Sequence, residues 1–105
     1  MIKMAITLLR NDMTLEEQQR WWIEDHAPIA RRVPGLKGYV IRLARPDEET
    51  GDAQICGTDD MVFATWEDAQ RAFVSPEWDA ARAHTAESGA KALRAWIRET
   101  VHIIG

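Results

Sequence analysis

The chain has 105 residues, of which 46% are hydrophobic and 29% are charged, so it can build one compact domain but not two. Its formal net charge of −4 has the wrong sign for a protein that binds nucleic acid or acidic membranes. No apolar run approaches the roughly 20 residues that cross a bilayer, so we expect a soluble, cytoplasmic protein. Cys56 is the only cysteine, which excludes an intrachain disulfide and a cysteine-pair metal site.

The first half of the chain predicts a strand, a helix and a second strand. Apolar residues alternate over residues 2–8, which indicates a strand, and residues 38–44 repeat this pattern. Thr14 and Glu17 have the spacing of a capping box, which predicts a helix that begins near Leu15. Pro28 predicts a kink or break in that helix just after His26, because the residue before a proline avoids helical angles. The spacing of its apolar residues places one group on the inward face: Leu15, Trp22, His26, Ile29 and Val33.

The second half of the chain predicts a loop, two strands and a helical layer between them. Residues 46–58 have no strong period and are rich in Gly, Asp and Glu, so we expect an exposed, mobile loop. Residues 60–65 form the third predicted strand, and Thr65 is a suitable N-cap for the helix that follows. Ser75 and Pro76 then predict a second helical piece that runs to about residue 86. Residues 93–103 alternate again and form the last predicted strand.

The order of these elements is β-α-β-β-α-β, which predicts a ferredoxin-like α+β sandwich with a four-stranded antiparallel sheet in a single domain, residues 1–105. Helices can cover only one face of such a sheet, yet both faces carry apolar side chains. An uncovered apolar face needs a partner. We therefore expect a homodimer in which two sheets pack face to face.

Two residues are candidates for acid–base chemistry. His26 lies on the inward helix face one turn after Trp22, and its ordinary pKa near 6.5 suits proton transfer. A buried histidine bonded to backbone is the competing interpretation. Tyr39, the only tyrosine, opens the second predicted strand and could donate a hydrogen bond to a developing enolate oxygen, or simply close the edge of the core.

Several other residues are candidates for lining a pocket that binds a small molecule. Large rings suit flat ligands but also fill small cores, so both functions stay open for the tryptophans. His84 lies at the margin of the inward face of the later helix. No pair of histidines has metal-ligand spacing, so we expect neither a metal nor another cofactor, and Cys56 has no neighbouring base that would activate its thiol. The predicted substrate-binding residues are Trp22, Trp66, Trp78 and His84.

The residues from Trp22 to Tyr39 resemble a known family. The pattern W-x3-H-x-P is formed by Trp22, His26 and Pro28, and the pattern P-G-L-x-x-Y runs from Pro34 to Tyr39. Together they resemble the EthD family, whose members are small dimeric α+β barrels. The resemblance implies that two sheets stack in a dimer and that each subunit has a pocket between helices and sheet. The chain is also similar to the methylmuconolactone methylisomerases, cofactor-free enzymes of that superfamily, and this likeness matches their pocket histidine and tyrosine to His26 and Tyr39.

Three functions follow from these observations, two of them enzymatic and one not. The favoured one is a cofactor-independent isomerase or lyase that acts on a small lactone or aromatic-derived substrate, with His26 moving a proton and Tyr39 polarising a carbonyl. The second is a small monooxygenase resembling the antibiotic-biosynthesis or haem-degrading branches of the superfamily, an oxidoreductase suggested by Trp66 and His84. The third is a ligand-binding accessory protein without catalysis, and in each case the loop 46–58 is a candidate for setting specificity.

Overall fold

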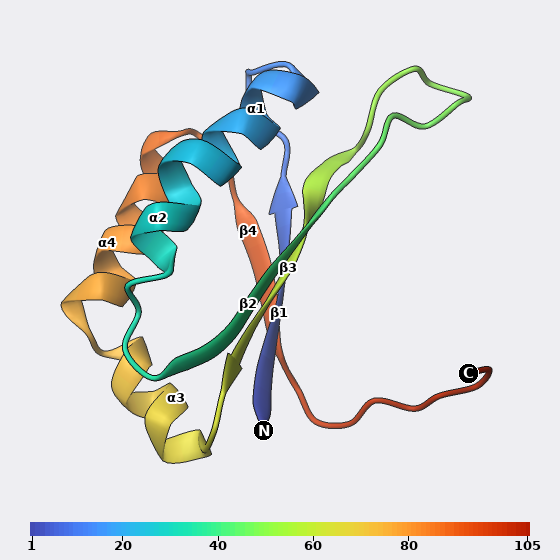
Figure 1. Ribbon diagram of the computed structural model, residues 1–105. Helices are drawn as coiled ribbons and strands as arrows, with labels where there is room; N and C mark the ends of the chain where they lie inside the picture. Colours follow the sequence, from blue (N-terminus) through green and yellow to red (C-terminus); the bar gives the residue numbers. More distant parts are fainter.

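The computed structural model describes residues 1–105 and confirms the ferredoxin-like α+β fold (Figure 1). One antiparallel sheet has the strand order β2-β3-β1-β4. All helices lie against one face of it and leave the opposite face open (Figure 1). In chain order the elements are β1 (Ile2–Leu9), α1 (Leu15–Trp21), η1 (Trp22–His26), α2 (Ala27–Ala30), β2 (Leu36–Leu43), β3 (Ile55–Phe63), α3 (Trp66–Phe73), α4 (Pro76–Glu87) and β4 (Ala92–Ile97).

The first helix begins where its capping box predicts. The Thr14 hydroxyl accepts a hydrogen bond from the Glu17 backbone N–H, and the Glu17 carboxylate accepts one from the Thr14 backbone N–H. The predicted break near Pro28 takes the form of a wider π-helical turn, η1, in which the Ala27 N–H donates to the Trp22 carbonyl. Because proline has no N–H and crowds the carbonyl four residues earlier, the helix changes its hydrogen-bond spacing just before Pro28.

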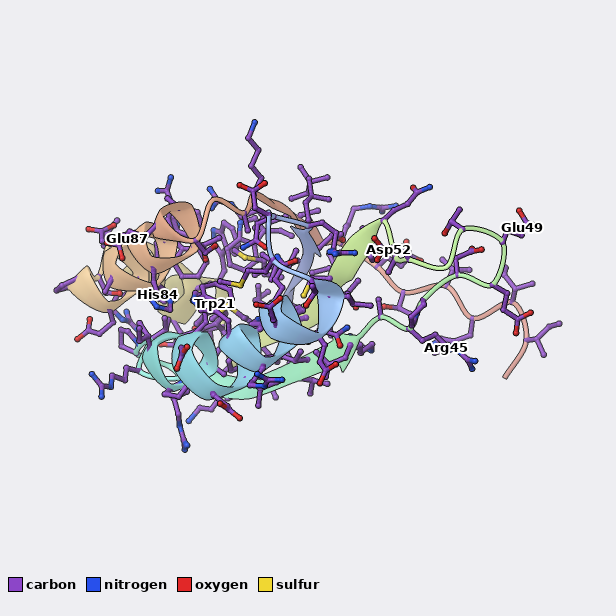
Figure 2. All side chains as sticks on the ribbon, turned by 90° about the horizontal axis from the view of Figure 1, so that it is seen from above. Trp21, Arg45, Glu49, Asp52, His84 and Glu87 are labelled. Carbon is purple, nitrogen blue, oxygen red and sulfur yellow. The ribbon has the colours of Figure 1, made fainter.

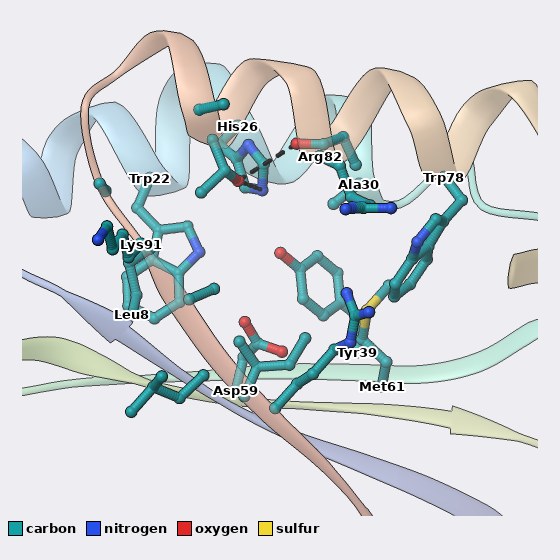
Figure 3. Close-up of a pocket in the computed structure, with 18 residues that line it drawn as sticks. Leu8, Trp22, His26, Ala30, Tyr39, Asp59, Met61, Trp78, Arg82 and Lys91 are labelled. Atoms are coloured by element: carbon teal, nitrogen blue, oxygen red, sulfur yellow. Dashed lines mark hydrogen bonds between the residues drawn. The ribbon is translucent and has the colours of Figure 1, made fainter.

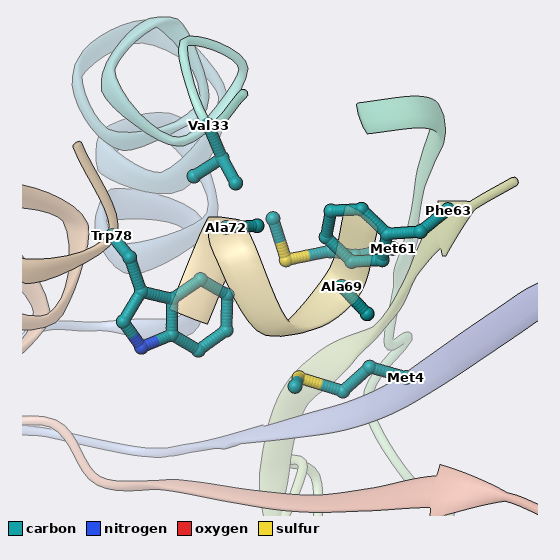
Figure 4. Packing of buried hydrophobic residues seen from close by; sticks show 7 residues of the cluster. All are labelled: Met4, Val33, Met61, Phe63, Ala69, Ala72 and Trp78. Carbon is teal, nitrogen blue, oxygen red and sulfur yellow. The ribbon is translucent and has the colours of Figure 1, made fainter. Parts of the chain in front are cut away.

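The core lies between the helices and the covered face of the sheet. Its main cluster is formed by residues of β1, β3, α3 and α4 together with Val33 (Figure 4): Met4, Val33, Met61, Phe63, Ala69, Ala72 and Trp78. A smaller cluster of Leu8, Trp22, Cys56 and Ala90 lies at the other end of the sheet. No helix is long and apolar enough to span a membrane.

Two boundaries differ from the sequence prediction by five residues or more, and the other strand ends differ by one or two. β3 begins at Ile55, so the predicted loop 46–58 is replaced by a connection over residues 44–54, in which Arg45, Glu49 and Asp52 extend beyond the body of the domain (Figure 2). Arg10 ties this loop to the domain through hydrogen bonds to the Asp52 carboxylate and the Ala53 carbonyl.

The last strand is the second boundary that the prediction placed wrongly. β4 ends at Ile97, not at residue 103, and residues 98–105 form an exposed tail that leaves the sheet (Figure 1). Ile97 pairs with Lys3, and β1 itself begins at Ile2. A longer β4 would therefore have no strand to bond to, although the apolar residues Val101 and Ile103 continue the alternation.

Candidate active site

A cavity of about 350 Å³ lies between the covered face of the sheet and the helices η1, α2 and α4 (Figure 3). Twelve of the 18 residues that line it are hydrophobic, and the walls include Leu8, Trp22, Met61 and Trp78. The polar side chains of His26, Tyr39 and Asp59 line the same space. A largely apolar cavity of this size with a few convergent polar groups is typical of a site for a small molecule.

His26 is held by a second histidine. Its Nδ1 lies 2.9 Å from Nδ1 of His84 on α4, so one ring donates a hydrogen bond to the other. The two rings are nearly parallel, and Trp21 stacks against both with centroid distances of 5.1 Å. Burial, with the neighbouring His84 as a smaller cause, lowers the pKa of His26 to about 4. His26 is therefore a neutral imidazole at pH 7, and its Nε2 lies 3.5 Å from the hydroxyl of the cavity residue Thr85.

Tyr39 presents its hydroxyl to the cavity from β2 (Figure 3). Burial is the main cause that raises its pKa above the ordinary value of 10, and the negative charge of Asp59 acts in the same direction. The phenol is therefore fully protonated near neutral pH. It is available as a hydrogen-bond donor to an oxygen of a bound molecule.

Asp59 is the site residue that the sequence analysis did not select. It is 5% exposed, and its carboxyl points into the cavity from β3 (Figure 3). Its Oδ1 has no hydrogen-bond partner. Burial, followed by the charge of Asp60, raises its pKa to about 7, whereas Arg42 acts in the opposite direction. The sequence signal was present, because Asp59 lies in phase with Met61 and Phe63 on the apolar face of β3.

The other predicted site residues separate into two groups. Trp22 and Trp78 line the cavity beside His26 and Tyr39, and their role in substrate binding stays a prediction. His84 does not line it and instead lies behind His26 as its hydrogen-bond partner. Trp66 lies outside the site at the start of α3, where it is 44% exposed and packs edge-on against Trp96.

Cys56 is also separate from the polar residues of the cavity. It is buried beside Leu8 and Trp22, and burial raises the pKa of its thiol to about 11. A protonated thiol is a poor nucleophile and metal ligand. No group of three or more His, Cys, Asp or Glu side chains is placed to hold a metal ion.

Comparisons of the sequence with family models and of the fold with solved structures point to the same family. A model of the EthD domain matches residues 10–87. No curated protein matches the chain in sequence. Among solved structures, an ethyl tert-butyl ether degradation (EthD) family protein from Bacillus halodurans is similar with a TM-score of 0.72 and 18% identity, over 90% of this chain and 97% of that one.

Two further solved structures share the fold. SnoaB from Streptomyces nogalater, a cofactor-independent oxygenase, is similar with a TM-score of 0.68 and 11% identity, over 97% of this chain and 95% of that one. A dimeric protein of unknown function and ferredoxin-like fold from Bacteroides fragilis gives a TM-score of 0.60 and 16% identity, over 91% and 95% of the two chains.

Proposed function

The chain belongs to the EthD family, and from that premise we propose that it is a cofactor-independent proton-transfer enzyme of the isomerase or lyase type. Its substrate in this proposal is a small lactone or an aromatic-derived compound with an enolisable carbonyl. The observation that carries the proposal is the convergence of an imidazole, a phenol and a buried carboxyl on one largely apolar cavity. Groups whose environments shift their pKa values in different directions are typical of acid–base sites.

In the proposed mechanism His26 is the base. Nε2 of its neutral ring takes a proton from the carbon beside the substrate carbonyl, while Nδ1 can pass its own proton to Nδ1 of His84. The Tyr39 phenol donates a hydrogen bond to the carbonyl oxygen, which becomes the enolate oxygen. Asp59 in its protonated form gives a proton to a second carbon, so that the substrate loses one proton, gains one and has its double bond or ring rearranged. The extra proton on the His26–His84 pair then returns through solvent to the Asp59 carboxylate, which restores the starting state.

Solvent deuterium exchange tests this mechanism directly. A panel of enolisable lactones and cyclic ketones is incubated with the protein in D₂O, and incorporation of deuterium is followed by NMR. We expect the wild type to catalyse exchange and His26→Ala to reduce it by about 100-fold or more, since general-base catalysis contributes about 10²–10⁴-fold. His102→Ala, which removes a histidine from the exposed tail, is the matched control and should exchange as the wild type does.

The results of this experiment separate the mechanism from its alternatives. Exchange that persists in a folded His26→Ala protein would refute the role of His26. If no panel member exchanges but ligands still bind, the chain is a binding protein or uses another reaction.

A second candidate function is a small cofactor-independent monooxygenase. The similarity to SnoaB, which is itself a cofactor-independent oxygenase, favours this alternative, as does a cavity walled by two tryptophans. Oxygen consumption with an electron-rich phenolic substrate, measured without added cofactor, distinguishes it from proton transfer. Consumption of oxygen coupled to product formation would establish the oxygenase, whereas exchange without oxygen uptake would exclude it for that substrate.

We also propose that the chain is a homodimer through the open faces of its sheet. The open face carries exposed apolar side chains, including Val40 (51% exposed) and Ile97 (37%), which alternate along their strands with residues of the covered face. Pairing two such faces removes this apolar area from water. Light scattering at micromolar concentration should give twice the monomer mass for the wild type and for Val74→Glu, which changes the helical layer, but a monomer for Val40→Glu. A monomeric wild type would refute the proposal.

A further inference from the structure

The cavity is more positive than the chain that forms it. Arg82, Lys91 and Arg94 line it, and Asp59 is its only acidic residue, although the whole chain has a net charge of −4. None of the three basic side chains takes part in an ion pair within the protein. A cleft with a concentration of one charge attracts ligands of the opposite charge.

Two of these cations and one unsatisfied donor meet at the Trp78 end of the cavity. The Arg94 guanidinium lies over the ring of Phe73, 4.8 Å from its centroid, and 5.9 Å from that of Trp78. Arg82 is one helical turn after Trp78 on α4 and lies next to it (Figure 3). The indole N–H of Trp78 is buried without a hydrogen-bond partner, and it points away from the core cluster (Figure 4).

A buried donor without an acceptor is costly, so it marks a place where a ligand atom would be stabilised. Arg82, Arg94 and the Trp78 N–H can all donate hydrogen bonds and none can accept one. Guanidinium groups match the planar geometry of a carboxylate, and the ring contacts of Arg94 hold its guanidinium in place. The remaining walls are mostly apolar, which suits a ligand with one charged group on a flat, uncharged body.

We infer that the Trp78 end of the cavity binds the carboxylate of a small, flat monoanion, through Arg82, Arg94 and the indole N–H of Trp78. This inference rests on the proposed function, because it names the class of substrate for the same site. With its carboxylate at this end, the body of the molecule lies between Trp78 and Trp22. Its other carbons then face His26, Tyr39 and Asp59, whose side chains line the same cavity (Figure 3).

Binding of benzoate and benzamide tests the inference without any turnover. The two molecules have nearly the same size and shape but differ in charge, and quenching of tryptophan fluorescence reports their binding. We expect benzoate to bind about tenfold or more tightly than benzamide, as a charge-assisted hydrogen bond would give. Arg94→Gln should remove this preference, whereas Arg98→Gln, which deletes an exposed arginine beyond the end of β4, should keep it.

Other outcomes would overturn the inference. Equal binding of benzoate and benzamide by the wild type refutes it, as does a preference that survives in both Arg94→Gln and Arg82→Gln. If Arg94→Gln does not fold, two other variants provide the test. Arg94→Lys keeps the positive charge at this position, and Arg82→Gln replaces a residue at an exposed position of α4.

The fate of the proposed function is measured separately. Selective benzoate binding without deuterium exchange on any substrate would leave the carboxylate site in place and refute the proton-transfer mechanism. Deuterium exchange that is equally fast on neutral and carboxylate-bearing lactones, and equally fast in Arg94→Gln, would support the proton-transfer mechanism and refute the carboxylate site.

Discussion

Replacing Asp59 by asparagine is expected to change how the stability of the protein depends on pH. Burial raises the pKa of Asp59 from its ordinary value of 3.8 to about 7, so the folded chain binds this proton more tightly than the unfolded chain. Stability contributed by the proton is complete below about pH 4 and is lost as the pH rises to about 7. At about 1.4 kcal/mol per pH unit, the loss amounts to at most about 4 kcal/mol.

Asparagine has nearly the same shape as aspartate and never ionises. The Asp59→Asn variant therefore does not lose stability from this titration as the pH rises. Urea unfolding of both proteins between pH 4 and pH 8 gives the difference in their free energies of unfolding at each pH. We expect this difference to move in favour of Asp59→Asn as the pH rises, by up to about 4 kcal/mol.

The titration of His26 changes stability with pH in the opposite direction, both in the wild type and in Asp59→Asn. The pKa of His26 is lowered from 6.5 to about 4, so its contribution to stability is lost as the pH falls through this interval. Because this effect is common to the wild type and the variant, it largely cancels in their difference. Asp12→Asn, which removes an exposed carboxyl, should reproduce the wild-type curve. A difference between Asp59→Asn and wild type that does not vary with pH would refute the reasoning.

Three further predictions concern packing and reactivity. A Cβ atom at Gly57 would lie 2.1 Å from the backbone carbonyl oxygen of Arg42. Gly57→Ala should therefore destabilise the protein by at least about 2 kcal/mol in urea unfolding. An unchanged free energy of unfolding would contradict this close spacing of β2 and β3. Cys56 is fully buried with its pKa raised to about 11, so it should react with a thiol-specific disulfide reagent only after unfolding; rapid reaction of the folded protein would argue against this burial. Trp78→Ala should lower the free energy of unfolding by about 3–5 kcal/mol and abolish benzoate binding. Trp66→Ala should retain benzoate binding. Equal losses of binding in the two variants would show that Trp66 belongs to the site.

Local signals in the sequence were sufficient for most of the fold. The capping box at Thr14 places the start of α1, and the Ser75–Pro76 pair places the start of α4. Alternation of apolar residues finds the strands, because the covered face of the sheet must be apolar whatever its neighbours are. The end of β4 was not predictable in this way, since it depends on where β1 begins and not on the residues that follow Ile97.

The site was predictable only in part for a related reason. His26 and Tyr39 stand out through their residue types and a family pattern, and the structure brings both to the cavity. The contact of His26 with His84 joins residues 58 positions apart, and no local pattern reports such a distance. Trp66 has the same chemistry as Trp78, and only its position on the first turn of α3 places it outside the cavity.

The most direct test of the account is the pH dependence of deuterium exchange catalysed by the wild type on an enolisable lactone. Exchange requires a neutral His26, whose pKa is about 4, and it is slowed when Asp59 ionises near pH 7 and places a negative charge beside the enolate. The account therefore predicts a bell-shaped profile with limbs near pH 4 and pH 7. An acid limb near pH 6.5, the ordinary pKa of a histidine in water, would contradict a buried, neutral His26 as the base.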